Sequence, residues 1–217
     1  MKGDIIIIEV HHKHAAELIV SKILADVNNS TRRFTLSIAG ESGSGKSEMA
    51  AAIASELKNQ GITSVVLGQD DYFVLPPKSN DGRRREDPDW LGPHVEVKLK
   101  VLEKNLRDAK QGENFIIKPV VDYEQNTIGE ETIDLTGIKV VIAEGTYTSL
   151  LKHIDKKIFI SANRLETLKH RKKRNRGNEV GDPFIEQILE IEHKIIAGHQ
   201  FLADFVISKD YDVAVMD

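Results

Sequence analysis

The chain has 217 residues, of which 40% are hydrophobic and 29% are charged, and its formal net charge is -4. These values are typical of one globular domain with a full hydrophobic core, and the acidic balance argues against nucleic acid as a partner. The chain has no cysteine, which excludes disulfides and cysteine-ligated metals. The longest apolar run near its start, Ile5–Ile8, is too short to span a membrane, so we expect a soluble cytoplasmic protein that does not act at a membrane. The oligomeric state stays open at this stage, with a homo-oligomer among the alternatives.

Apolar strands alternate with helical patterns along the chain. Strands are expected at 5–8, 34–39, 62–67, 115–121, 140–143, 157–160 and 205–207, and helices at 15–27, 47–58, 95–110, 165–174 and 183–196. Pro119 favours an edge position for the strand at 115–121, and four prolines predict a loop over 76–93. The alternation predicts an α/β fold with a mainly parallel sheet flanked by helices.

No linker divides the chain, so residues 1–217 are expected to form a single domain. Residues 1–33 would add a strand and a helix at its start. Residues 75–134 would form a small insertion that covers the functional site.

A glycine-rich loop follows the apolar strand at 34–39 and fits the pattern G-x-x-x-x-G-K-[ST]. Backbone N–H groups of such a P-loop surround phosphates, Lys46 can reach the β and γ oxygens, and the Ser47 hydroxyl can ligate magnesium. The helix that follows directs its positive end at the same anion. The expected fold is therefore that of a P-loop NTPase, which binds a nucleoside triphosphate together with Mg²⁺. The predicted nucleotide-binding residues are Gly40, Glu41, Ser42, Gly43, Ser44, Gly45, Lys46, Ser47 and Glu48.

Two further strands end in acidic residues. Asp70 and Asp71 follow the strand at 62–67, and Glu144 ends the strand at 140–143. Since the carboxyl ends of parallel strands share one ligand crevice, Asp70 is expected near the γ-phosphate. There it could accept a proton from an attacking hydroxyl and help to hold magnesium, while Asp71 is expected to play a structural part. Glu144 is placed to ligate magnesium directly or through water, with a turn-capping role as the alternative.

The densest basic run of the chain is Arg171–Gly177. In a kinase such side chains fold over the phosphates and stabilise the charge that is transferred, so residues 171–182 are a candidate lid. Arg171 and Arg174 are the candidate catalytic arginines, and Arg176 is a candidate nucleotide contact. A solvated helix face is the alternative explanation.

In this order and spacing, the motifs resemble those of the uridine kinase and phosphoribulokinase family of P-loop kinases, over Phe34 to about Ile207. Besides the P-loop, the family's Q-D-x-[YF]-[YF] stretch is similar to Gln69–Phe73, and its D-H-P-D-A-F segment to Glu86–Leu91. The remaining matches are P-x-Y-D at 119–122, E-G at 144–145, R-x-x-R-D and R-G at 171–177, and A-D-[VF]-[VI]-I at 203–207.

This resemblance implies ATP-dependent phosphorylation of a small-molecule hydroxyl. It implies that Asp70 is the base, that Lys46 clamps the phosphates, that Ser47, Asp70 and Glu144 form the magnesium site, and that the lid arginines contact the γ-phosphate. The positions that it assigns to acceptor binding are Tyr72, Phe73, Glu86, Asp122 and Asn126.

Several positions depart from the nucleoside-binding pattern of the family. Phe73 lacks a hydroxyl, Val121 replaces a tyrosine, Asn126 stands where a histidine is usual, and Glu86 and Asn175 each replace an aspartate. A site that hydrogen-bonds its substrate discriminates through such groups, so these changes argue against uridine. Other acceptors such as pantothenate, a sugar phosphate, glycerate or another nucleoside remain open, as does a family member that binds ATP without transferring phosphate.

Other features have simpler explanations. The histidines His11, His12 and His14 are expected to face solvent rather than to bind metal. Trp90 is expected to pack rather than to stack on a substrate ring. The run Arg83–Arg85 is expected to be a solvated loop, with recognition of an anionic acceptor as the alternative. A GTPase switch would carry an N-K-x-D motif, which the sequence lacks.

Overall fold

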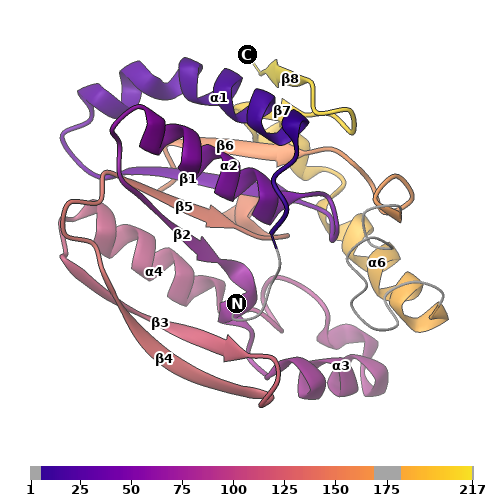
Figure 1. Cartoon of the computed structure of the whole chain (residues 1–217). Helices are drawn as coiled ribbons and strands as arrows, with labels where there is room; N and C mark the ends of the chain where they lie inside the picture. Colours follow the sequence, from indigo (N-terminus) through magenta and orange to yellow (C-terminus); the bar gives the residue numbers. More distant parts are fainter. Residues whose placement is uncertain (1–5, 169–181, 217) are drawn as a thin grey trace.

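The computed structural model describes residues 6–168 and 182–216. In this part of the chain a six-stranded sheet has the order β2-β5-β1-β6-β7-β8 (Figure 1). Neighbouring strands are parallel except for β7 and β8, which are antiparallel. The strands are β1 (Phe34–Gly40), β2 (Ser64–Gly68), β5 (Val140–Glu144), β6 (Lys156–Ile160), β7 (Phe205–Ile207) and β8 (Val213–Val215). The predicted α/β fold with a mainly parallel sheet is confirmed.

Helices cover both faces of this sheet. Figure 1 shows α1 and α2 on one face and α4 on the other. The helices are α1 (Val10–Asn29), α2 (Lys46–Asn59), α3 (Pro77–Glu86), α4 (Leu99–Lys110) and α6 (Pro183–Ile196). Four short 3₁₀ turns complete the described segments: η1 (Gln69–Tyr72), η2 (Pro88–Trp90), η3 (Thr148–Leu150) and η4 (His199–Leu202). None of the helices in residues 6–168 and 182–216 has the length and apolar character needed to cross a bilayer.

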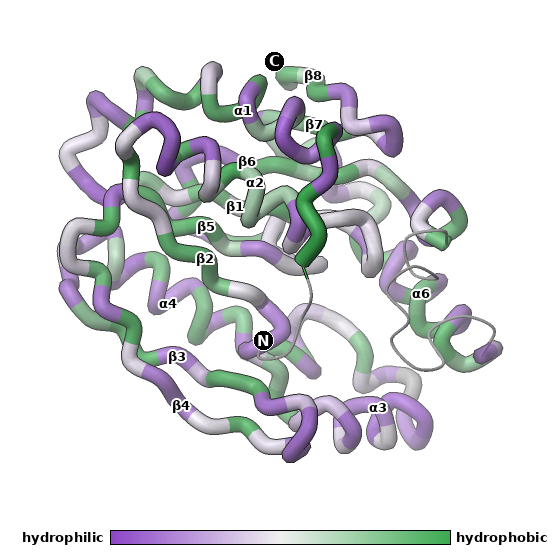
Figure 2. Tube along the Cα trace, in the orientation of Figure 1, coloured by the Kyte–Doolittle hydropathy of each residue, from purple (hydrophilic) through white to green (hydrophobic). Residues whose placement is uncertain are grey.

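The central strand β5 feeds both hydrophobic cores because its side chains alternate between the faces of the sheet. Val140 and Ile142 pack in the core that α1 and α2 cover, whereas Val141 and Ala143 pack in the core of α4. All four are completely buried. A strand that is apolar on both faces is typical of a parallel sheet, and the central strands are accordingly green along much of their length in Figure 2.

The start of the chain differs from the prediction. Residues 6–9 have neither helix nor strand, so no strand spans 5–8 within the described residues. Instead α1 begins at Val10, five residues before the predicted start. Its buried stripe includes Ile19, Ile23 and Val27, while Leu18 is exposed. The described part of the β-branched run that favoured a strand therefore leads directly into α1 and does not join a sheet.

The proline-rich stretch at 76–93 is not a simple loop, because it contains α3 and η2. Pro77 occupies the first helical turn, where the missing N–H of proline has no helical partner to lose. The N–H of Asn80 donates to the carbonyl of Pro76 at 2.8 Å and closes the first turn. Helix α3 carries few apolar residues and is mostly purple in Figure 2, which explains why its sequence gives little helical periodicity.

The segment at 115–121 is also placed differently. It forms β3 (Phe115–Asp122), which pairs antiparallel with β4 (Thr127–Asp134) in a separate two-stranded sheet rather than at the edge of the main sheet. The sequence of β4 alternates charged, polar and small residues with only two isoleucines, so it gave no strand signal. The sequence patterns also did not predict β8.

The helix predicted at 165–174 is described only at its start. Residues 164–167 form a turn, Leu168 is helical, and residues 169–174 lie outside the described part.

Candidate active site

The P-loop connects β1 to α2 and depends on three glycines. Gly40, Gly43 and Gly45 have φ values of 154°, 80° and 93°, which side-chain-bearing residues rarely adopt. A Cβ on Gly40 would lie 2.8 Å from the Ser44 Oγ and 2.9 Å from the carbonyl oxygen of Ile160. Inside the loop, the carbonyl of Glu41 accepts from the Ser44 N–H at 3.1 Å and from the Lys46 Nζ at 2.9 Å. These contacts hold the backbone of the loop in a tight curl.

The geometry of this loop fits a phosphate group. Helix α2 begins at Lys46, and its N-cap residue Gly45 has no side chain that could cap the N–H groups of the first turn. Ser44 is buried, and its hydroxyl makes no hydrogen bond within the described residues. Uncapped amides at the positive end of a helix, together with a buried hydroxyl that lacks an acceptor, form the donor set that binds an anion.

The register of the sheet brings the two predicted acidic positions to this loop. Glu144 lies opposite Ile38 on one side and Gly68 on the other, so the ends of β1, β2 and β5 coincide. Asp70 follows β2 in η1 and is exposed to solvent. The prediction that Asp70 and Glu144 meet beside the P-loop is therefore met by the backbone geometry, while their chemical roles remain proposals.

The charges at this edge interact. Burial and the negative charge of Asp70 raise the pKa of Glu144 to about 7, whereas Lys46 and a hydrogen bond with Ser47 act in the opposite direction. Two close carboxyl groups that disfavour joint ionisation suit a divalent cation, which would offset their charge. Within residues 6–168 and 182–216 no three His, Asp or Glu side chains gather into a metal-binding group. The donor set thus fits Mg²⁺, which is commonly held by one or two protein groups together with substrate phosphates.

Gln69 and Gly145 interlock the two acidic strand ends. Gly145 has a φ of 153°, and a Cβ at this position would collide with the Cβ of Gln69. The Gln69 Oε1 accepts a hydrogen bond from the Tyr147 N–H at 2.8 Å. The contact fixes the start of η1, and hence Asp70, against the end of β5. Sequence reasoning used both residues only as parts of motifs and missed their contact.

Asp71 points into the protein, in contrast to Asp70. Its carboxylate pairs with the Lys118 Nζ at 2.7 Å, and both side chains are only 5% exposed. It also accepts from the Val121 N–H at 3.1 Å, and Lys118 forms a second ion pair with Glu131. Asp71 therefore attaches η1 to the β3–β4 hairpin, as the structural part expected for it requires.

The residues assigned to acceptor binding are distributed over several elements. Tyr72 is fully buried, and its hydroxyl donates to Asn105 at 3.0 Å, so its side chain belongs to the core. The Cζ of Arg84 lies over the ring of Phe73, 5.8 Å from the centre of the ring.

The other three assigned residues lie on α3 and the β3–β4 hairpin. Glu86 is largely exposed and pairs with Arg83. At the hairpin turn Asp122 accepts from Gln125, and Asn126 accepts from the N–H of Lys78 in α3. The structure therefore groups Asn126 with α3 and separates Tyr72 from this group.

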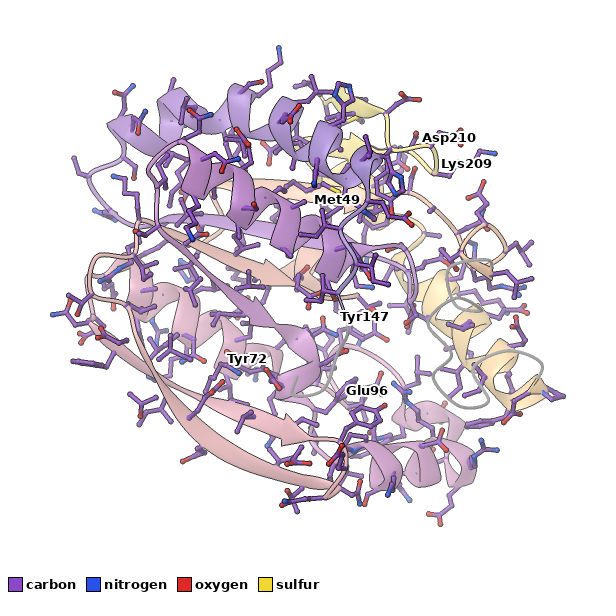
Figure 3. The ribbon with its side chains drawn as sticks, in the orientation of Figure 1. Met49, Tyr72, Glu96, Tyr147, Lys209 and Asp210 are labelled. Atoms are coloured by element: carbon purple, nitrogen blue, oxygen red, sulfur yellow. The ribbon has the colours of Figure 1, made fainter. Side chains whose placement is uncertain are left out.

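A buried carboxylate that the sequence did not single out connects α3 to the sheet. Glu96 is 1% exposed, and its oxygens accept from Arg84 at 2.6 and 2.8 Å, from Asn80 at 3.2 Å and from the Tyr147 hydroxyl at 3.4 Å. Trp90 donates to Asn80 at 2.8 Å, in accordance with its expected packing role. Figure 3 shows Glu96 and Tyr147 toward the α3 side of the sheet, with Met49 on the α2 side.

The basic residues of α3 are ion-paired rather than freely solvated. Arg83 pairs with Asp87 at 2.9 Å, and Arg85 pairs with Asp81 and with Asp182, the residue that caps α6, at 3.2 Å each. With the Arg84–Glu96 pair, every arginine of this run has an acidic partner. The expected loop at 83–85 is thus wrong, because the segment belongs to helix α3, whereas Arg83 and Arg85 are exposed to solvent as expected.

The histidines at the start of the chain are not all solvent-facing. His12 is completely buried, and its Nε2 lies 3.0 Å from the Tyr211 hydroxyl. That hydroxyl fills the space beside Gly45, where a Cβ would collide with it. His12 and Tyr211 therefore support the outer side of the P-loop, whereas His14 is exposed. The candidate lid arginines Arg171, Arg174 and Arg176 lie outside the described residues.

A P-loop on a parallel sheet, with acidic residues at the ends of two neighbouring strands, defines the class of P-loop NTPases. The model of the phosphoribulokinase / uridine kinase family matches residues 35–194, and the chain belongs to this family. The family takes its name from two kinases, and the curated relatives of this chain include further kinases.

Among its relatives is the bifunctional alpha-galactosidase/sucrose kinase AgaSK of Mediterraneibacter gnavus, which is 30% identical over 85% of this chain and 21% of its own length. A uridine kinase of Ureaplasma urealyticum serovar 10 is 30% identical over 60% of this chain and 63% of its own length. The chain therefore covers less than two thirds of either relative. Among solved structures, a possible uridine kinase from Bacillus stearothermophilus has a TM-score of 0.59 at 20% identity, over 77% of this chain and 93% of that chain.

Proposed function

We propose that this kinase transfers the γ-phosphoryl group of ATP to a hydroxyl of a small neutral molecule. The observation that carries the proposal is the shared register of β1, β2 and β5, which brings Asp70 and Glu144 to the P-loop. A nucleotide-binding switch would need the loop, but it would not need an exposed carboxylate such as Asp70 at the point where an acceptor hydroxyl approaches the γ-phosphate.

In this proposal the donor half of the site binds the triphosphate. The amides of the first turn of α2 and the Lys46 ammonium hold its oxygens, and Ser47 and Glu144 hold magnesium with the help of Asp70. When bound, magnesium would offset the charge of the β- and γ-phosphates. The Lys46 Nζ donates to the carbonyl of Glu41, so its side chain is directed across the loop.

Asp70 acts as the general base. Its carboxylate takes the proton of the acceptor hydroxyl while that oxygen forms a bond to the γ-phosphorus and the bond to the β-γ bridging oxygen breaks, which leaves ADP. Arg171, Arg174 and Arg176 are proposed to stabilise the charge of the transferred group from the lid at 171–182. The segment 75–134, which includes α3 and the hairpin, is proposed to bind the acceptor.

Within this reaction we favour a sugar or a similar polyhydroxyl compound as the acceptor. The arginines of α3 are already paired with carboxylates, which supports a neutral acceptor over a sugar phosphate or glycerate. The sucrose kinase relative matches over most of this chain. A uridine acceptor is less well supported, because Val121, which replaces the family's tyrosine, is fully buried.

An ADP-release screen tests the function directly. The purified protein would be incubated with ATP, Mg²⁺ and separate acceptors: sucrose, monosaccharides, uridine, cytidine, pantothenate, glycerate and sugar phosphates. We expect release with a neutral sugar and none with the anionic compounds. ADP release with uridine alone would overturn the sugar assignment, and ATP binding without ADP release in any well would support a binding protein without transferase activity.

Two further measurements concern location and assembly. Cell fractionation would test the proposed cytoplasmic location, and solution mass measurements would test a homo-oligomeric state.

A further inference from the structure

Helix α6 contacts the P-loop from outside through one carboxylate. The Glu192 Oε1 accepts from the Ser42 N–H at 2.6 Å, and its Oε2 accepts from the Ser42 hydroxyl at 2.9 Å. Glu192 is 7% exposed and lies 150 positions from Ser42 in the sequence. One side chain thus binds both polar groups that Ser42 offers on this side.

The neighbouring contacts restrict the same two loop residues. The His193 Nδ1 lies 2.5 Å from the Glu41 Oε1, and the Thr167 hydroxyl is 3.4 Å from the carbonyl of Ser42. Glu41 and Ser42 stand at positions that the P-loop pattern leaves unspecified. The phosphate chemistry described above therefore does not require Glu192, His193 or Thr167.

The buried Glu192 carboxylate beside the P-loop is unfavourable for phosphate binding unless it has a structural role. Burial raises the pKa of Glu192, while the positive charge of Lys46 and the two hydrogen bonds from Ser42 lower it. A negative charge close to a site for a triphosphate weakens phosphate binding, and burying it costs free energy unless its oxygens are bonded. Both carboxylate oxygens of Glu192 accept hydrogen bonds from Ser42 of the loop. The position of Glu192 is explained if its hydrogen bonds stabilise the conformation of the loop by more free energy than its negative charge costs in phosphate binding.

We propose that Glu192 is a positioning residue of the P-loop, which holds Ser42 by its amide and its hydroxyl so that the loop is curled before ATP arrives. A preformed site binds more tightly because less conformational freedom is lost on binding. The inference rests on the proposed function in one respect, namely that this loop binds ATP.

The central test compares two glutamates of α6. Glu192→Ala should raise the Kd and the KM for ATP at least about tenfold, as expected for the loss of hydrogen bonds to a charged group, with a smaller effect on kcat. Glu190→Ala is the matched control, because Glu190 is 48% exposed and pairs with Arg164 and Lys194 rather than with the loop. It should leave both constants unchanged. ATP binding would be measured by calorimetry on the full chain.

Two further variants separate positioning from general destabilisation. Glu192→Gln keeps an oxygen for the Ser42 amide and should restore most of the affinity, even if Glu192→Ala folds poorly. Ser42→Ala removes only the hydroxyl contact, and its effect should be smaller than that of Glu192→Ala and not additive with it. Hydrogen exchange of residues 40–47 in the nucleotide-free protein should be faster in Glu192→Ala and unchanged in Glu190→Ala.

The possible failures are distinguishable. If the wild-type protein binds no ATP, the proposed function fails and the inference fails with it. If the wild type binds ATP and Glu192→Ala binds it equally well, or if both alanine variants weaken binding alike, only the inference fails. Tighter binding by Glu192→Ala would show that the carboxylate competes with phosphate, and it would also overturn the proposal.

Discussion

The two halves of the proposed site, one for the phosphoryl donor and one for the acceptor, are built by different means. The donor half is held by backbone geometry: glycines with positive φ, an uncapped helix start and the parallel register that aligns β1, β2 and β5. The acceptor half is held by side chains, chiefly Arg84, Asn80 and Tyr147 around Glu96, together with the Asp71–Lys118 pair. Backbone devices tolerate change in the surrounding side chains, whereas a side-chain network is particular to one sequence. If the proposed halves are correct, the acceptor half of this chain should therefore be more sensitive to substitution of its side chains than the donor half.

The largest expected effect that tests the contrast between the donor and acceptor halves is the loss of kcat on substitution of Asp70. Asp70→Asn should lower kcat by about 10²- to 10⁴-fold, because the amide cannot take the proton of the acceptor hydroxyl. The Kd for ATP, measured by calorimetry, should change little since the loop is untouched. Full turnover by this variant would contradict the assignment of the base.

The next largest effect should appear in the acceptor half. Arg84→Ala leaves the buried Glu96 carboxylate without its cation and should lower the free energy of unfolding by about 3–5 kcal/mol, measured in urea. Arg83→Ala is the matched control, since its pair with Asp87 is exposed and should contribute less than about 1 kcal/mol. Equal losses in the two variants would refute the anchoring role of Glu96.

A smaller effect is expected where the two strand ends interlock. Gly145→Ala forces a Cβ against Gln69 at a φ of 153° and should destabilise the protein by about 1–3 kcal/mol, with a fall in kcat as Asp70 shifts. Gly82→Ala serves as the comparison, because Gly82 lies in α3 with no atom within 4 Å of an added Cβ. It should be neutral or slightly stabilising. Thermal melts and kcat of both variants would decide.

The smallest effect is expected at Tyr72. Tyr72→Phe removes one buried hydrogen bond to Asn105 and should cost about 1 kcal/mol of stability. Because the ring is in the core, the KM for the acceptor should stay the same. A large rise in this KM would instead support the acceptor contact that the family resemblance implies.

The sequence predicted the P-loop and the strands that lead to the two acidic residues, because their signals are local. The loop pattern, the apolar strand at 34–39 and the acids after two further strands are each visible within a few residues, and the parallel register follows from the fold class. The acceptor half depends on contacts between distant residues. Glu96 binds Tyr147, 51 positions away, and nothing around Val95 and Val97 marks it as a buried carboxylate.

Local signals were also misleading in the acceptor half. Four prolines concealed α3, since two of them stand at its start, where proline is tolerated. The polar alternation of β4 resembles a loop until it is paired with β3. His12 was expected in solvent because nothing in its own segment indicates that Tyr211 lies beside it.

The contact between Gln69 and Gly145 also has a consequence for building chimeras of related kinases. The two residues follow different strands, β2 and β5, yet the space beside Gln69 depends on the absence of a side chain on Gly145. A transplant of the segment around Asp70 into another member would succeed only where the recipient carries glycine at the position that corresponds to Gly145. The two motifs would therefore have to be exchanged together, although Gln69 and Gly145 are 76 positions apart in the chain.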